Sequence, residues 1–170
     1  MALFDMAAYD EASAPAAGSV RNERYAMPRS EASIVIDRTP EDVWAYVSEP
    51  ENLVVWNSAL VSAQPDGPMR VGGRLQGQVK FLGKKMDYVN ELTAFDAPKR
   101  SAYSSIESPF PWHGETLVEP EGDGAKVTVS LESDNIGGFF GKLADPVVAK
   151  MYSRQMRSDL ENLKEILEHA

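Results

Sequence analysis

Apolar residues recur every three or four positions near the end of the chain, and this spacing predicts a long amphipathic helix over residues 145–169. Asp145 is a capping residue and Pro146 suits the first helical position. Charged residues fill the opposite face, so the helix needs a large concave partner. Its inner face comprises Val148, Met151, Tyr152, Gln155, Met156, Leu160, Leu163 and Leu167.

The middle of the chain alternates between apolar and polar residues with a period of two, which predicts strands. We expect seven of them, over residues 32–37, 59–64, 71–82, 85–95, 99–107, 111–119 and 125–133. Turn sequences such as Glu121-Gly122-Asp123-Gly124 separate neighbouring strands and favour an antiparallel sheet. Two short helices are expected after the first strand, one starting at Pro40 behind a Thr39 cap and one at Pro50. The predicted fold is therefore α+β, with a seven-stranded curved antiparallel sheet wrapped around the long C-terminal helix.

Strand parity separates inward-facing from outward-facing residues. Charged residues at the alternate positions of a strand mark its solvent-facing side. Met86, Tyr88 and Asn90 should therefore point inward, whereas His113 should point outward. The inner side is more polar than a filled core, which predicts a ligand cavity; alternatively, its hydroxyls bond one another or buried water. The predicted ligand contacts are Trp56, Phe81, Met86, Asn90, Ser105, Trp112, Thr116, Phe139, Phe140, Met151 and Gln155.

Only a few of the inward-facing groups suit proton transfer. Tyr88 and Tyr103 are the candidate catalytic residues, as proton donors or oxyanion partners. Glu107 is the one carboxylate with a suitable parity, although an exposed strand-end acid is the simpler interpretation. Phe139 and Phe140 lie among glycines, so they form either a mobile flap over the cavity mouth or a cap on the core.

Composition narrows the classes of function. The 170 residues suit one folded domain over 31–170, preceded by a tail or linker over 1–30 that could instead dock on the domain through Phe4 and Tyr9. A net charge of −9 argues against nucleic-acid binding. No apolar run is long enough for a membrane span, so a cytoplasmic location is the default expectation. With no cysteine and two histidines, we expect no metal site. Without a phosphate loop or a dinucleotide fingerprint, we expect no nucleotide cofactor. The oligomeric state stays open, including a homodimer.

Several short motifs accompany this order of elements: Thr39-Pro40-Glu41-Asp42-Val43-Trp44, Pro50-Glu51-Asn52-Leu53-Val54-Val55-Trp56, Val71-Gly72-Gly73, Lys85-Met86, Ala97-Pro98-Lys99-Arg100 and Gly122-Asp123-Gly124-Ala125-Lys126-Val127. Over about residues 30 to 168 the chain resembles the START-like (SRPBCC) helix-grip superfamily, and within it the bacterial polyketide cyclase/dehydrase-like branch. The resemblance implies a cavity that binds a hydrophobic small molecule such as a polyketide, a lipid or an aromatic compound. A cyclase or dehydratase of specialised metabolism and a protein-partner-binding module are the alternatives.

Overall fold

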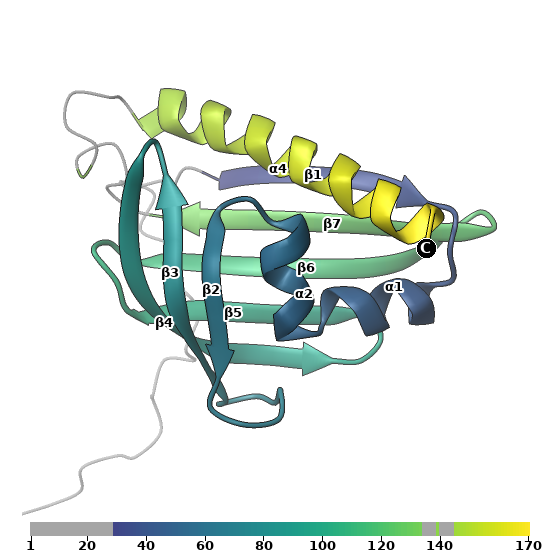
Figure 1. Cartoon of the computed structure of the whole chain (residues 1–170), viewed down its shortest axis with the longest axis horizontal. Helices are drawn as coiled ribbons and strands as arrows, with labels where there is room; N and C mark the ends of the chain where they lie inside the picture. Colours follow the sequence, from purple (N-terminus) through teal and green to yellow (C-terminus); the bar gives the residue numbers. More distant parts are fainter. Residues whose placement is uncertain (1–28, 134–138, 140–144) are drawn as a thin grey trace, which may run out of the picture.

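A computed structural model describes residues 29–133, 139 and 145–170. Seven strands form one antiparallel sheet in the order β1-β7-β6-β5-β4-β3-β2 (Figure 1). The strands are β1 (Arg29–Ile36), β2 (Leu60–Pro65), β3 (Arg74–Phe81), β4 (Lys84–Asp96), β5 (Arg100–Glu107), β6 (Trp112–Glu121) and β7 (Gly124–Ser133). The helices are α1 (Pro40–Val47), α2 (Pro50–Trp56) and α4 (Asp145–Glu168). These elements confirm the predicted α+β fold.

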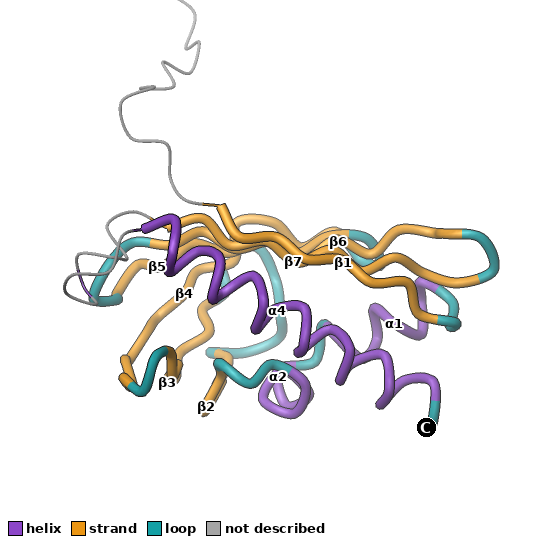
Figure 2. Tube along the Cα trace, turned by 90° about the horizontal axis from the view of Figure 1, so that it is seen from above, coloured by secondary structure: helices purple, strands orange, loops and turns teal. Residues whose placement is uncertain are grey.

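The sheet is strongly curved. Seen from above, β1, β7 and β6 form a nearly flat layer, whereas β4, β3 and β2 curl away from it towards the side that α4 and α2 occupy (Figure 2). Strand β4 is 13 residues long, and its register with β5 shifts twice, between Val89 and Asn90 and between Leu92 and Ala94. Such bulges bend a strand and increase its twist. The curl leaves a concave face for the long helix.

The two short helices begin where the sequence predicts. The Thr39 hydroxyl accepts a hydrogen bond from the Asp42 backbone N–H at 3.2 Å, and Pro40 follows at the first helical position. Pro50 likewise lies at the start of α2, although the Glu49 side chain makes no capping hydrogen bond. Because each proline presets the helical φ and lacks an N–H that would be left unbonded, the chain can start a second helix directly after the first.

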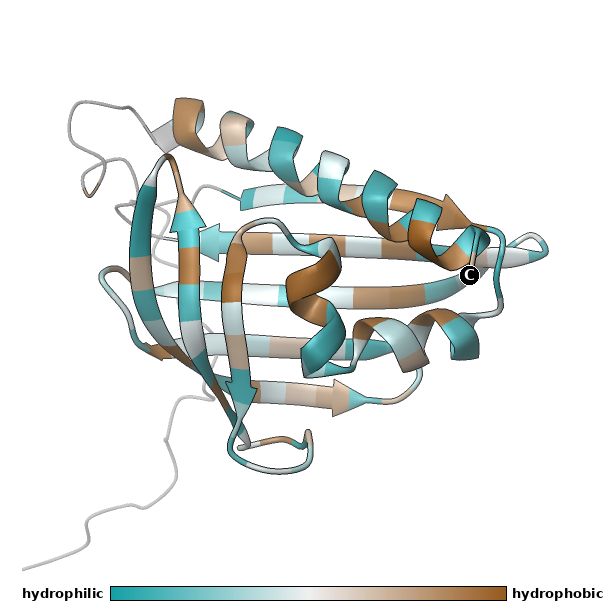
Figure 3. Ribbon diagram, viewed as in Figure 1, coloured by the Kyte–Doolittle hydropathy of each residue, from teal (hydrophilic) through white to brown (hydrophobic). Residues whose placement is uncertain are grey.

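The buried residues form two clusters that share α4. The first packs Ile36, Val43 and Val127 against Leu160 and Leu163, all with no exposed surface. The second gathers aromatic residues of the curled strands and receives Val148 from the other end of the helix. Hydrophobic and hydrophilic bands alternate along β7, as a period of two predicts (Figure 3). One part of the helix therefore sits in a closed core, and the other faces the curled strands.

The structure corrects some of the expected boundaries. The strand expected from residue 71 starts at Arg74, because Gly72 adopts a φ of +78° and Val71 is exposed. The glycines nevertheless pair with β4, since the Gly72 N–H donates to the Leu92 carbonyl at 2.8 Å. No helix among the described residues is long and apolar enough to cross a membrane. Of the tail expected over 1–30, Arg29 and Ser30 belong to β1, and the remainder, with Phe4 and Tyr9, lies outside the described residues.

Candidate functional site

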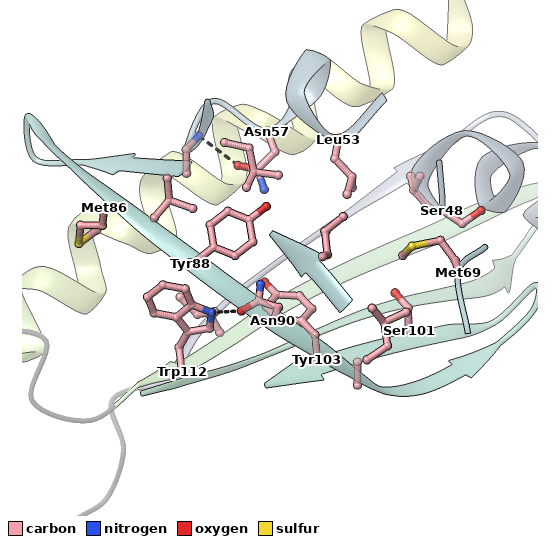
Figure 4. Close-up of a pocket in the computed structure, with 18 of the residues that line it drawn as sticks. Ser48, Leu53, Asn57, Met69, Met86, Tyr88, Asn90, Ser101, Tyr103 and Trp112 are labelled. Atoms are coloured by element: carbon pink, nitrogen blue, oxygen red, sulfur yellow. Dashed lines mark hydrogen bonds between the residues drawn. The ribbon is translucent and has the colours of Figure 1, made fainter. Parts of the chain in front are cut away.

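A cavity of about 130 Å³ lies between the curled strands and the helices (Figure 4). Strands β3, β4 and β5 supply much of its wall, and α2 and α4 contribute Leu53 and Tyr152. Much of the lining is apolar or aromatic, including Leu60, Leu75 and Phe110. An engineered apolar cavity of about 150 Å³ takes up benzene, so this space suits a molecule of about one or two rings.

The structure brings six of the predicted site residues together in this wall. They are Phe81, Met86, Tyr88, Asn90, Tyr103 and Trp112. Met86, Tyr88 and Asn90 are buried and project from the same side of β4, as strand parity predicts. The rings of Tyr88 and Trp112 lie with centroids 6.3 Å apart, and the Trp112 indole N–H donates to the Asn90 side-chain oxygen at 2.9 Å. Parity was thus sufficient to find this part of the wall.

Two predicted contacts lie next to the wall. The Ser105 hydroxyl accepts a hydrogen bond from the Trp112 backbone N–H at 3.0 Å and does not line the cavity. Phe139 packs beside the cavity with its ring 5.2 Å from that of Phe110. Both side chains position residues of the wall. Phe140, the other half of the proposed flap, lies outside the described residues.

The remaining predicted contacts lie elsewhere. Trp56 is buried in the closed core, Thr116 is half-buried away from the cavity, and the Gln155 amide donates to the Ser58 hydroxyl at 3.2 Å. Met151 is 40% exposed and lies outside the wall. The reason is the rotation of α4. Its buried stripe runs through Val148, Tyr152, Met156 and Leu163, and at 3.6 residues per turn Met151 lies roughly a third of a turn from the centre of that stripe.

Other residues of the wall were missed by the sequence analysis. Tyr152 projects from α4, and its ring meets that of Phe81 edge-on at 5.2 Å. Its place on the apolar helical face was visible in the sequence, but its contact with the cavity was not. Asn57 follows α2, and Ser48 and Met69 lie outside regular elements at another part of the wall (Figure 4). No periodic pattern points to residues in such connections.

The described wall of the cavity contains no charged side chain. Burial raises the pKa of Tyr103 to about 12 and also raises the pKa values of Tyr88 and Tyr152. All three phenols therefore stay neutral at neutral pH and can donate a hydrogen bond, while none is ready to act as a base. The Tyr88 hydroxyl donates to the Ser62 carbonyl at 3.2 Å.

The groups that could act as bases lie away from the cavity. Glu107 is exposed at the end of β5. His113 points outward, as parity predicts, and its Nδ1 lies 2.8 Å from the Ser104 hydroxyl on the outer face. The cavity wall, within the part of the chain that the structure describes, offers apolar surface and neutral hydrogen-bonding groups.

A curved sheet that holds one long helix across a mainly apolar cavity defines the helix-grip, START-like class of hydrophobic-ligand-binding folds. The chain belongs to the family described as polyketide cyclase/dehydrase and lipid transport, whose sequence model matches residues 27–168. No protein of curated function matches the sequence.

Solved structures share this fold at low sequence identity. The Thermus thermophilus protein TTHA0849 is 24% identical, with a TM-score of 0.71 over 84% of this chain and 98% of its own. A START superfamily protein from Mycobacterium smegmatis is 14% identical, with a TM-score of 0.68 over 83% of this chain and 97% of its own. The di-domain ARO/CYC StfQ of the steffimycin biosynthetic pathway is 11% identical, with a TM-score of 0.69 over 84% of this chain and 51% of its own.

Proposed function

We propose that the protein binds a neutral, mainly apolar small molecule, such as an aromatic compound, a polyketide or a lipid, in the cavity between the curled strands and α4. The observation that carries this proposal is the composition of the wall, where aromatic and aliphatic side chains surround a few uncharged polar groups. If these strands enclosed a filled core instead of a cavity, we would expect apolar residues at the positions of Asn90 and Tyr103. We keep the cytoplasm as the expected location.

The wall also limits the charge of the ligand. Transfer of an ionised carboxylate or ammonium group from water into a site without a counter-charge is strongly unfavourable. The described wall holds no Lys, Arg, Asp, Glu or His that could supply one. An ionised headgroup would therefore have to stay at the surface, with only the apolar part of the molecule inside.

Calorimetry with a panel of neutral aromatic compounds tests the proposal. Ser101 lines the cavity, and Ser101→Phe should fill part of it and abolish binding. Ser104 lies on the same strand but contacts His113 on the outer face, so Ser104→Phe is the matched control and should bind normally. Equal affinities for the two variants would refute this cavity as the binding site. Native mass spectrometry of the protein from its own host would then identify any molecule it carries.

Cyclisation or dehydration of a reactive chain is the second candidate. The phenol of Tyr103 favours it, whereas the Tyr88 hydroxyl already donates to the Ser62 carbonyl. Neutral hydroxyls can stabilise the negative charge that develops on a carbonyl oxygen in such reactions. The absence of a base from the described wall makes binding the simpler function. If the protein is an enzyme, Tyr103→Phe should lower turnover while ligand affinity is retained. If it is a carrier, affinity alone should change.

A further inference from the structure

The amide of Asn90 has a fixed orientation. Its side-chain oxygen lies 2.9 Å from the indole Nε1 of Trp112, and both residues are buried. An indole N–H can only donate, so the atom facing it must be the amide oxygen. The amide nitrogen consequently points away from the indole (Figure 4). This NH₂ group has no hydrogen-bond partner among the described residues, and Asn90 lines the cavity.

A second asparagine repeats the arrangement. The side-chain oxygen of Asn57 accepts a hydrogen bond from the Ala59 backbone N–H at 3.0 Å. Asn57 also lines the cavity, and within the described chain its NH₂ group is bonded to nothing. Each amide oxygen therefore accepts a hydrogen bond within the protein, whereas each NH₂ group is available as a donor to the cavity.

Tyr103 adds a further neutral donor to the wall of the cavity. In the pairing of β4 with β5, Asn90 is opposite Ser105 and Leu92 is opposite Tyr103. Asn90 and Tyr103 are thus diagonal neighbours on the same face of the sheet, a separation that long side chains can bridge. Tyr103 is neutral at neutral pH, and its hydroxyl has no hydrogen-bond partner in the described structure. Its ring extends over Gly114 of β6, so the hydroxyl offers the cavity a donor separate from the Asn90 amide.

We propose that Asn90 selects ligands that carry a carbonyl or a similar neutral oxygen acceptor. This inference rests on the binding function proposed above and specifies its ligand class. A ligand oxygen at this position gains a hydrogen bond from the amide, which contributes about 0.5–1.5 kcal/mol. A ligand that offers an N–H at the same position meets the donor face of the amide.

Three neutral bicyclic molecules of similar size separate the contributions. Indanone has a carbonyl acceptor, indane has no hydrogen-bonding group, and indole has an N–H donor. Their dissociation constants would be measured by calorimetry at about pH 8 for the wild type and for Asn90→Asp. This substitution keeps an oxygen for the Trp112 indole but replaces the NH₂ donor with a second oxygen. Asn162→Asp is the control, because it adds the same charge on an exposed residue of α4.

In Asn90→Asp, indanone should bind about tenfold more weakly relative to indane, because one hydrogen bond is lost and two acceptors face each other. Indole should bind more tightly than in the wild type, and Asn162→Asp should change neither ratio. If the indanone-to-indane ratio is the same in Asn90→Asp as in the wild type, the inference is refuted while the binding function stands. If none of the three molecules binds the wild type, the proposed function fails and the inference fails with it.

A measurement on the unsubstituted protein gives an independent answer should Asn90→Asp not fold. The side-chain amide protons of Asn90 can be followed by NMR during titration. Saturation with indanone should shift both their resonances and those of the Tyr103 ring, whereas indane should shift only the ring resonances. Identical amide shifts with the two ligands would contradict a hydrogen bond from Asn90 to the carbonyl.

Discussion

Because Gly114 has no side chain, the Tyr103 ring can lie directly over it. The two residues are directly opposite each other in the β5–β6 pairing, and a Cβ atom at Gly114 would overlap the Cζ and hydroxyl oxygen of Tyr103. In Gly114→Ala the ring must therefore move, and the neighbouring cavity of about 130 Å³ is the space into which it can move. The substitution should put an aromatic ring where the ligand binds.

The expected energies follow from this geometry. Overpacking costs about 1–3 kcal/mol, but the ring can yield, so the lower end of that range applies. Replacing glycine by alanine within a strand raises the free energy of unfolding by about 0.5–1 kcal/mol, because alanine loses less backbone entropy on folding. We expect Gly114→Ala to lower the free energy of unfolding by at most about 1 kcal/mol. Ligand affinity should nevertheless fall by about tenfold or more, since the ring and the ligand compete for one space.

Gly77 provides the contrast. A Cβ atom there would overlap the backbone carbonyl of Ser62 on the neighbouring strand β2, and a backbone cannot rotate away as a side chain can. Gly77→Ala should therefore lower the free energy of unfolding by about 3 kcal/mol, because β2 and β3 must separate. Urea denaturation measures the stabilities, and titration with indanone measures the affinities. Equal destabilisation by the two substitutions, together with unchanged affinity in Gly114→Ala, would refute this reasoning.

Two further predictions concern stability. Leu160 is fully buried in the closed core, so Leu160→Ala should lower the free energy of unfolding by about 2–5 kcal/mol without changing ligand affinity. The control, Glu161→Ala on the exposed side of the helix, should change the free energy of unfolding by less than about 0.5 kcal/mol. A loss of binding in folded Leu160→Ala would contradict the separation of core and cavity. The Asp37 backbone N–H donates to the Glu168 carboxylate at 2.7 Å and, with Lys164, holds the pKa of Glu168 below its ordinary value of 4.5. The stability that this lowered pKa contributes is present above pH 4.5 and is lost as the pH falls through the native pKa. In urea denaturation across this range, Glu168→Gln should therefore lose less free energy of unfolding on acidification than the wild type does. Identical pH profiles for the two proteins would show that the contact does not contribute.

Local patterns in the sequence were sufficient for the elements and for one side of the cavity. The Thr39 cap, the two helix-starting prolines and the parity of β4 all depend on neighbouring residues in the chain, and the structure confirms each of them. Met86, Tyr88 and Asn90 could be placed for that reason. The family resemblance predicted the overall arrangement that these elements adopt.

The rest of the cavity depends on how separate elements meet. Met151 was predicted to face inward because it shares a helical spacing with buried residues, but the rotation of α4 against the sheet leaves it exposed. Asn57 and Met69 reach the wall from connections whose course is set by the curl of the sheet. The orientation of the Asn90 amide on β4 can be assigned only when the position of the Trp112 indole on β6 is known. Parity alone cannot supply any of these relations.

The division of the buried residues into two clusters along α4 has a consequence for evolution. Mutations around Tyr152 and the curled strands can change the ligand while the residues around Leu160 and Leu163 keep the domain folded. For protein engineering, a library confined to the cavity cluster should contain many folded members with altered binding, and the same number of changes in the closed cluster should mostly yield unfolded chains.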